Sequence, residues 1–274
     1  MSTPLLELAI QAKYFAQRQV IDQLAFNVAP GEVVSLVGPS GCGKSTLLRL
    51  IAGLDRDYQG QLRIHGEAPT LHSRHVGFIF QEPRLLPWLS VADNVGFELG
   101  RGGGQHPRVQ ELLAEVGLAD FADAYPKQLS GGMAQRVAIA RGLFTQPSLL
   151  LLDEPFSAVD AFTRMRLQEL LLSIARHHQI TLLLVTHDVN EAAYLSDRVI
   201  VLGSHPGRIR GEVTLDLPRP RQRHDPRLAG LAAHILHLLD HAAADPLETA
   251  HATAATDPTQ PAATLSFSRM HFAI

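Results

Sequence analysis

The sequence predicts an α/β fold, in which helices cover both faces of a parallel sheet. Four runs are almost entirely apolar, as expected of strands that are covered on both sides: residues 33–37, 149–152, 181–185 and 199–202. Between the second and third runs, residues 162–176 carry apolar side chains at helical spacing, which predicts a crossover helix. Strands that alternate with helices in this way are typical of a parallel sheet.

Two further parts of the chain extend this core. Short, partly alternating segments at residues 6–10, 24–28 and 61–65 predict an antiparallel β subdomain with one buried face. Residues 83–142 predict an inserted α-helical subdomain, with helices at 91–99 and 109–116 and a glycine-rich connecting loop at 101–104.

The composition is that of an ordinary globular protein. The chain has 274 residues, of which 46% are hydrophobic and 19% charged, and a formal net charge of −3. This balance gives no electrostatic case for nucleic acid as a partner. The single cysteine excludes a disulfide framework. We expect no signal peptide, and no apolar run approaches the about 18–20 residues that cross a bilayer.

A phosphate-binding loop follows the first apolar strand. Residues 38–45 read GPSGCGKS, which satisfies the G-x-x-x-x-G-K-S/T pattern between a strand and a predicted helix at 46–52. Glycines let successive backbone N–H groups face one anion, with the helix N-terminus behind them. Lys44 would reach the β- and γ-phosphates, and the Ser45 hydroxyl would ligate Mg²⁺. The chain is therefore predicted to bind a nucleoside triphosphate.

Two adjacent carboxylates follow the second apolar strand. Asp153 and Glu154 come directly after four leucines, and ligands of open α/β sheets lie beyond the carboxyl ends of the strands. Asp153 is expected to hold Mg²⁺, and Glu154 to polarise the water that attacks the γ-phosphate. The alternative is that either carboxylate only caps the next element.

A second motif narrows the class of nucleotide-binding protein. Residues 129–133 read LSGGM and precede a helical run. Together with the phosphate loop and the acidic pair, this motif resembles the ATP-binding cassette of an ABC transporter, and the matching motifs run in order from Phe15 to about residue 202. The resemblance implies an ABC ATPase domain with a P-loop NTPase (RecA-like) core over residues 1–216. Beyond it, a turn-rich run and apolar residues at helical spacing predict a linker and helix at 217–241. Residues 242–274 are rich in Ala, Thr and Pro, which predicts a loose tail.

The resemblance also implies roles for individual residues. Gln81 would contact Mg²⁺ and the attacking water, and His187 would sense the γ-phosphate. Ser130, Gly131 and Gly132 would hold the γ-phosphate that a second copy of the protein binds, and Asp160 lies in the loop that communicates across such a dimer. The full set expected to hold nucleotide is Phe15, Gly38, Pro39, Ser40, Gly41, Cys42, Gly43, Lys44, Ser45, Thr46, Ser130, Gly131, Gly132 and Asp160.

Three positions leave alternatives open. An aromatic residue would stack on adenine, and counting back from Val20 favours Phe15, with Tyr14 as the alternative. Cys42 lies between two loop glycines, where positive potential would favour a reactive thiolate; it could instead point into the packed interior. Trp88 lies in a segment, EPRLLPW, that either meets a membrane partner or fills the core of the helical subdomain.

The family resemblance implies an ATP-hydrolysing motor that binds MgATP between two cassettes, most simply a homodimer, and drives transmembrane permease subunits. Such a motor would lie at the cytoplasmic face of the inner membrane and serve a solute-binding protein indirectly. The EPRLLPW segment is similar to the branch of importers for aliphatic sulfonates, taurine or nitrate. The alternatives are an importer motor for another small solute and a soluble ABC ATPase that does not transport. A GTPase is disfavoured because the chain lacks an Asn-Lys-x-Asp motif.

Overall fold

The computed structural model describes residues 3–70, 73–204 and 206–243. Its larger sheet has six strands in the order β5-β6-β7-β3-β8-β9, of which the first five are parallel and β9 is antiparallel to β8. The strands are β3 (Val33–Val37), β5 (Val76–Ile79), β6 (Leu149–Asp153), β7 (Thr181–Val185), β8 (Arg198–Leu202) and β9 (Ile209–Thr214). The predicted parallel sheet is confirmed. Strand β9 was not predicted, because its side chains alternate and only one of its residues is buried.

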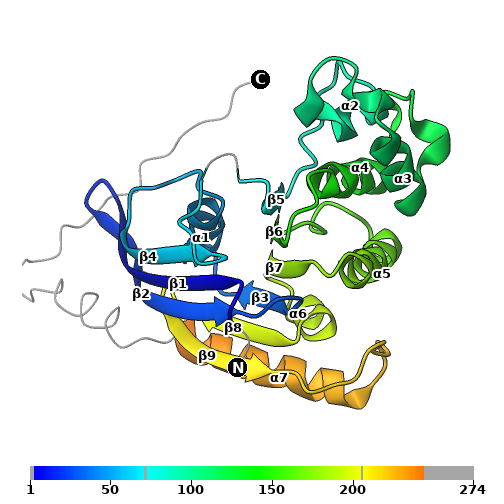
Figure 1. Ribbon diagram of the computed structural model, residues 1–274. Coiled ribbons are helices and arrows are strands. Elements are labelled where there is room, and N and C mark those ends of the chain that lie inside the picture. Colours follow the sequence, from blue (N-terminus) through cyan, green and yellow to red (C-terminus); the bar gives the residue numbers. More distant parts are fainter. Residues whose placement is uncertain (1–2, 71–72, 205, 244–274) are drawn as a thin grey trace, which may run out of the picture. The chain divides into compact units, whose positions relative to one another are not determined.

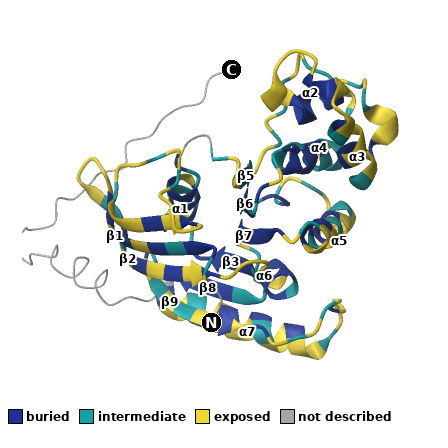
Figure 2. Cartoon of the chain, viewed as in Figure 1, coloured by how far each residue is buried: buried dark blue, intermediate teal, exposed yellow. Residues whose placement is uncertain are grey.

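The apolar strands are covered on both faces, and this explains why their sequences do not alternate. Along β6, Leu149 and Leu151 pack with α1 (Lys44–Ile51) and the antiparallel sheet, whereas Leu150 and Leu152 pack with α4 (Gly131–Leu143) and α5 (Ala161–His177). Figure 2 shows β3, β6 and β7 as almost continuously buried. Helix α1 begins at Lys44, two residues before the predicted start.

A smaller antiparallel sheet packs over α1, as Figure 1 shows. Its order is β2-β1-β4, and its strands are β1 (Leu6–Phe15), β2 (Arg18–Val28) and β4 (Gln59–Ile64). The predicted segments at 6–10 and 24–28 lie inside longer strands. Strand β4 ends at Ile64 rather than at the predicted His65, because His65 has a φ of 53° and leaves the extended conformation.

A helical segment is inserted between β5 and β6, as predicted. It contains α2 (Val91–Val95), α3 (Pro107–Glu115) and α4, with 3₁₀ turns at Phe97–Leu99, Gly103–Gln105, Ala119–Phe121 and Pro126–Gln128. The predicted helix at 91–99 is wrong beyond Val95. Gly96 packs so closely on Gly103 that a Cβ on Gly96 would lie 2.2 Å from the Gly103 carbonyl oxygen. The backbone therefore turns there instead of continuing as a helix, and the predicted loop at 101–104 contains the second 3₁₀ turn.

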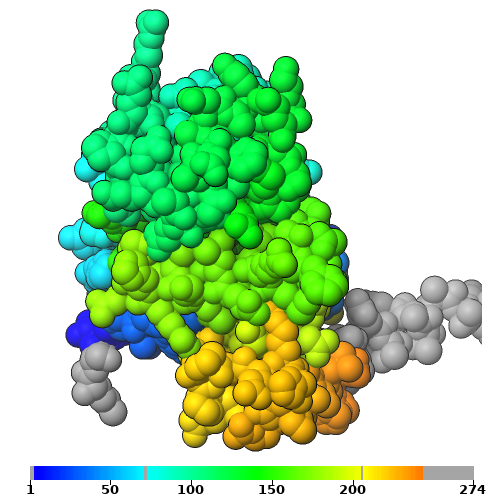
Figure 3. Space-filling view, turned by 90° about the vertical axis from the view of Figure 1, so that its right-hand side faces the viewer, coloured from blue at the N-terminus to red at the C-terminus, as the bar shows by residue number. Residues whose placement is uncertain are grey.

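The last described elements flank the far edge of the larger sheet. Helices α6 (Val189–Leu195) and α7 (Pro226–Ala243) pack on β8 and β9 around a third apolar cluster that includes Ile235. Figure 3 shows α7 in orange below the part of the molecule that includes α5, with the inserted helices in green above. No helix among the described residues is long and apolar enough to cross a bilayer. The predicted tail lies outside the described residues from 244 onward.

Candidate functional site

The phosphate loop lies between β3 and α1, and glycine is required at its tightest points. Gly41 and Gly43 have φ values of 79° and 98°, a region that side chains with a Cβ disfavour. A Cβ on Gly38 would lie 2.8 Å from the Leu202 carbonyl oxygen on the neighbouring strand β8. The glycines therefore let the loop curl against the sheet and place the start of α1 at its mouth.

Lys44 is held inside this loop and is only 7% exposed. Its Nζ donates hydrogen bonds to the carbonyl oxygens of Gly38, at 2.7 Å, and Pro39, at 2.9 Å. A buried ammonium group needs such partners, because burying an unpaired charge is costly. The loop therefore carries its positive charge at a fixed place, directly beside the backbone that would cradle phosphates.

Cys42 does not have the reactive character that its position in the sequence suggested. Its side chain is 1% exposed and packs in the core with Leu202 and α1. Burial raises the pKa of the Cys42 thiol, and this effect outweighs the nearby Lys44 ammonium, which lowers it. The expectation of an activated thiolate is wrong, and only the backbone of Cys42 remains available to a nucleotide.

We therefore expect folded protein to resist labelling of Cys42 by a maleimide, because a buried, protonated thiol is a poor nucleophile. Labelling should be slow with and without MgATP and become fast when the chain is unfolded in denaturant. Since Cys42 is the single cysteine, mass spectrometry reports on it directly. Rapid labelling of folded protein that MgATP slows would contradict the buried orientation.

Ser45 and Asp153 form a pair of oxygen ligands at the end of the loop. The Ser45 hydroxyl donates a hydrogen bond of 3.0 Å to Asp153 Oδ1. Burial raises the pKa of the Asp153 carboxyl, and so does neighbouring Glu154, while the hydrogen bond from Ser45 acts in the opposite direction. A hydroxyl and a carboxylate are ligands that suit Mg²⁺, and a cation there would favour the ionised carboxylate.

Glu154 is fixed by contacts on both sides. Its backbone adopts a φ of 46°, unusual for a residue with a side chain, and its N–H donates to the Val185 carbonyl at the end of β7. The side chain is 24% exposed, and its Oε2 lies 3.0 Å from Nδ1 of His187. The loop after β6 therefore aims Glu154 toward the phosphate loop, and His187 holds its carboxylate.

A cavity of about 440 Å³ joins these elements. The residues that line it are Phe15, Arg18, Val20, Ser40, Gly41, Gly43, Lys44, Ser45, Thr46 and Glu154. Phe15 is 48% exposed, and the Nζ of Lys13 lies 4.8 Å from the centre of its ring. Tyr14 does not line the cavity. This placement favours Phe15 over Tyr14 as the residue that stacks on a base. Arg18, which was not among the predicted site residues, also lines the cavity.

Gln81 is exposed and follows the end of β5, whose Ile79 pairs with Leu152. This register brings the chain around Gln81 next to the Asp153–Glu154 turn. Gln81 itself does not line the cavity.

The LSGGM motif lies at the surface, outside this cavity. Ser130 caps α4, accepting a hydrogen bond of 3.3 Å from the Met133 N–H. Gly132 lies against Thr163, and Asp160 caps α5 by accepting a bond from the Thr163 N–H at 3.0 Å. The motif and the Asp160 loop are thus neighbours, and within one chain neither lines the cavity that holds Lys44.

Two residues that the sequence analysis missed shape the segment after Gln81. Arg141, on α4, donates to the carbonyl oxygens of Pro83 and Arg84 at 2.8 and 2.9 Å. Asn94 is fully buried and bonds the backbone of Leu86 through both its oxygen and its amide nitrogen. Polar side chains inside a helical pattern give little sign of such a role, because their partners are distant loop carbonyls.

Comparisons with known proteins agree with these features. A sequence model described as "ABC transporter" matches residues 21–157. An "Aliphatic sulfonates import ATP-binding protein SsuB 2" of Burkholderia cenocepacia is 56% identical over 250 residues, which cover 90% of this chain and 93% of that protein. An "SsuB 1" protein of the same description from Xanthomonas axonopodis pv. citri is 60% identical over 228 residues, which cover 81% of this chain and 90% of that protein.

A solved structure shares the fold. The dimeric ATP-binding cassette MJ0796, in a post-hydrolysis state bound to ADP and Pi, superposes with a TM-score of 0.66 at 31% identity and covers 78% of this chain. The family model matches half of the chain, and the two SsuB relatives, at 56% and 60% identity, cover 90% and 81% of it. These matches show the family to which the chain belongs. The chain belongs to the ABC transporter family, as one of its ATP-hydrolysing subunits.

Proposed function

We propose that this chain is the motor of an importer for aliphatic sulfonates, and that it binds MgATP between two cassettes and couples hydrolysis to solute uptake. The choice of solute rests on one observation. Proteins named for aliphatic sulfonate import are 56–60% identical to this chain and cover 81–90% of it. Taurine and nitrate are the alternatives that the sequence left open.

The proposed chemistry assigns one task to each polar residue at the loop. Ser45, Asp153 and Gln81 would hold Mg²⁺, which neutralises charge on the β- and γ-phosphates. Lys44 and the backbone of the loop would bind the same phosphates. Glu154 would accept the proton of the attacking water, and His187 would orient the Glu154 carboxylate, 3.0 Å away.

The cavity supports a site shared by two chains. Within one chain, Ser130 and Asp160 lie outside the pocket that contains Lys44. Ser130 is nevertheless the N-cap of a 13-residue helix, so the free backbone N–H groups of the first helical turn follow it directly. Such N–H groups favour the binding of an anion. A second copy, related by a two-fold axis, would bring its Ser130, Gly131 and Gly132 over the γ-phosphate.

The segment after Gln81 is suited to meet a permease. Arg141 and Asn94 fix its backbone, while the Trp88 side chain within it is 70% exposed. Beside it lies a groove of about 380 Å³ whose lining includes Phe80, Arg84 and Phe97. Exposed aromatic and arginine side chains of this kind are typical anchors of protein interfaces. We propose that a helix of the permease occupies the groove, which would place the chain at the cytoplasmic face of the inner membrane.

We expect Trp88→Ala to leave ATP hydrolysis by the free subunit within about twofold of wild type, because Trp88 does not line the nucleotide cavity. In the assembled transporter, the same change should lower solute uptake at least about tenfold, the usual cost of losing an interface anchor. The matched control is Leu236→Ala, which removes another half-exposed apolar side chain, on α7. Equal loss of both activities would assign Trp88 to folding instead.

The solute is tested in proteoliposomes that contain the chain, its permease and its binding protein. An aliphatic sulfonate without an amino group should stimulate ATP hydrolysis and enter the vesicles, whereas nitrate should do neither. Stimulation by taurine or nitrate alone would reassign the solute. Hydrolysis that never responds to a permease would favour the soluble, non-transporting alternative.

A further inference from the structure

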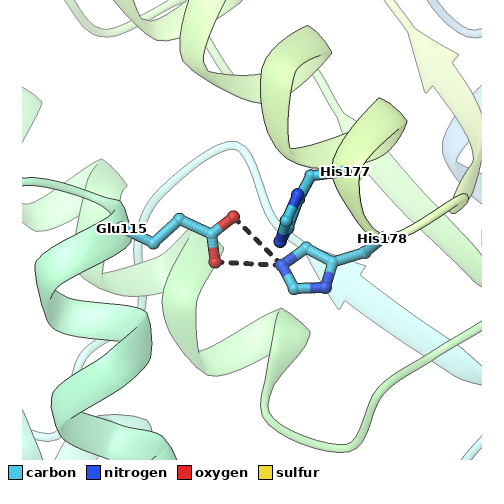
Figure 4. Close-up of side chains that lie close together, drawn as sticks. All are labelled: Glu115, His177 and His178. Atoms are coloured by element: carbon cyan, nitrogen blue, oxygen red, sulfur yellow. Dashed lines mark hydrogen bonds and ion pairs between the residues drawn. The ribbon is translucent and has the colours of Figure 1, made fainter.

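Three side chains outside the nucleotide cavity converge on one point. Glu115 is the last residue of α3, His177 is the last residue of α5, and His178 caps α5. One potential ligand atom from each residue lies within 4.8 Å of the other two. Figure 4 shows Glu115 reaching across from α3 toward both rings. We call these three residues the His–Glu cluster.

The geometry of the cluster is close to that of a metal site. His178 Nε2 lies 3.0 and 2.9 Å from the two carboxylate oxygens of Glu115. The ring of His177 meets the ring of His178 edge-on, with centroids 4.8 Å apart. Ligand atoms at about 2.0–2.1 Å from a tetrahedral Zn²⁺ lie about 3.3 Å from each other. The three ligand atoms of the cluster lie within 4.8 Å of one another, at most about 1.5 Å beyond that spacing, and the His177 side chain is exposed.

The surroundings favour a cation. Helices α3 and α5 both end at the cluster, so the negative ends of two helix dipoles meet there. Glu111, one turn before Glu115, lines the same cavity of about 510 Å³. The nearby Arg108 lines the cavity as well, but its guanidinium donates to the carbonyl oxygens of Leu143 and Phe144, both at 3.0 Å. Its charge is therefore directed at the end of α4.

We propose that the His–Glu cluster binds Zn²⁺, with His177, His178 and Glu115 as ligands and a fourth position open to water. Two imidazoles and a carboxylate are ligands that Zn²⁺ commonly takes in proteins. Such an ion would join α3, in the inserted helical segment, to the end of α5 in the core, and so fix the inserted segment against the core. The inference does not depend on the proposed transport function.

The test is a titration of Zn²⁺ into full-length, metal-stripped protein without nucleotide, followed by calorimetry. Wild type should bind Zn²⁺, and His177→Gln should weaken that binding at least about tenfold, since loss of even an outer-shell partner costs about 10–100-fold. His177 is exposed, so this variant should fold normally. Glu115→Gln keeps the shape and a hydrogen bond to His178, and should weaken binding similarly. Zn²⁺ should also raise the melting temperature of wild type and not that of His177→Gln.

The matched control removes a histidine from another pair. His237 and His241 lie one turn apart on α7, with their Nε2 atoms 3.0 Å from each other. His237→Gln should leave the affinity of the His–Glu cluster within about twofold, because the pair lies on a different helix. The proposal is overturned if no Zn²⁺ binds, if His177→Gln and Glu115→Gln bind as wild type does, or if only His237→Gln loses affinity. In each case His178 and Glu115 form an ordinary hydrogen-bonded pair.

Discussion

Replacing Glu154 by glutamine is expected to lower ATP hydrolysis about 10²–10⁴-fold, the usual contribution of a general base. The amide keeps the size of the side chain, and its oxygen can still accept a hydrogen bond from His187, but it cannot take a proton from water. ATP binding should be retained, because Lys44 and the loop backbone are unchanged. The variant should therefore accumulate as a dimer with bound ATP.

The measurement combines hydrolysis, nucleotide binding and size-exclusion chromatography with light scattering. Glu67→Gln is the matched control, because it makes the same chemical change at an exposed residue away from the cavity, and it should behave as wild type. A Glu154→Gln protein that stays monomeric at high protein and ATP concentrations, with the permease also present, would contradict the shared site. Unchanged hydrolysis would remove Glu154 from the chemistry.

The local structure of the phosphate loop could be predicted because its determinants are local in sequence. Gly38, Gly43 and Lys44 belong to one continuous loop, and their backbone requirements follow from residue type alone. Asp153 and Glu154 could be placed because a run of four leucines fixes where a buried strand ends. The structure adds distances to these placements, such as the 3.0 Å between Ser45 and Asp153.

Other features depend on contacts between distant residues, and the sequence does not reveal them. The Cys42 side chain is buried in the apolar cluster around α1, and burial raises the pKa of its thiol more than the Lys44 ammonium lowers it. The helix that starts at Val91 stops at Gly96 because Gly103 approaches its backbone. The role of Arg141 depends on carbonyl oxygens 57 and 58 residues away. Periodicity and motif spacing carry none of this information.

The proposed shared site requires Ser130 of one chain and Lys44 of another to serve the same ATP, and a mixing experiment tests this. Lys44→Ala should abolish ATP binding in its own chain, because Lys44 is the one lysine among the described residues that line the cavity. Ser130→Arg should place a bulky cation where a partner's γ-phosphate would lie. Each variant alone should be inactive. In a mixed dimer, however, one of the two sites combines an intact phosphate loop with an intact LSGGM motif.

Random pairing of the two inactive variants should therefore restore about a quarter of the wild-type number of intact sites, since half of the dimers carry one intact site out of two. ATP hydrolysis measured across mixing ratios should peak at equal amounts. The loss of the helix cap in Ser130→Arg costs about 1 kcal/mol, so its melting temperature is checked first. A chain that carries both substitutions offers the control, because mixing it with either single variant creates no intact site. If the two single variants stay as inactive together as apart, Lys44 and Ser130 do not serve the same ATP from different chains.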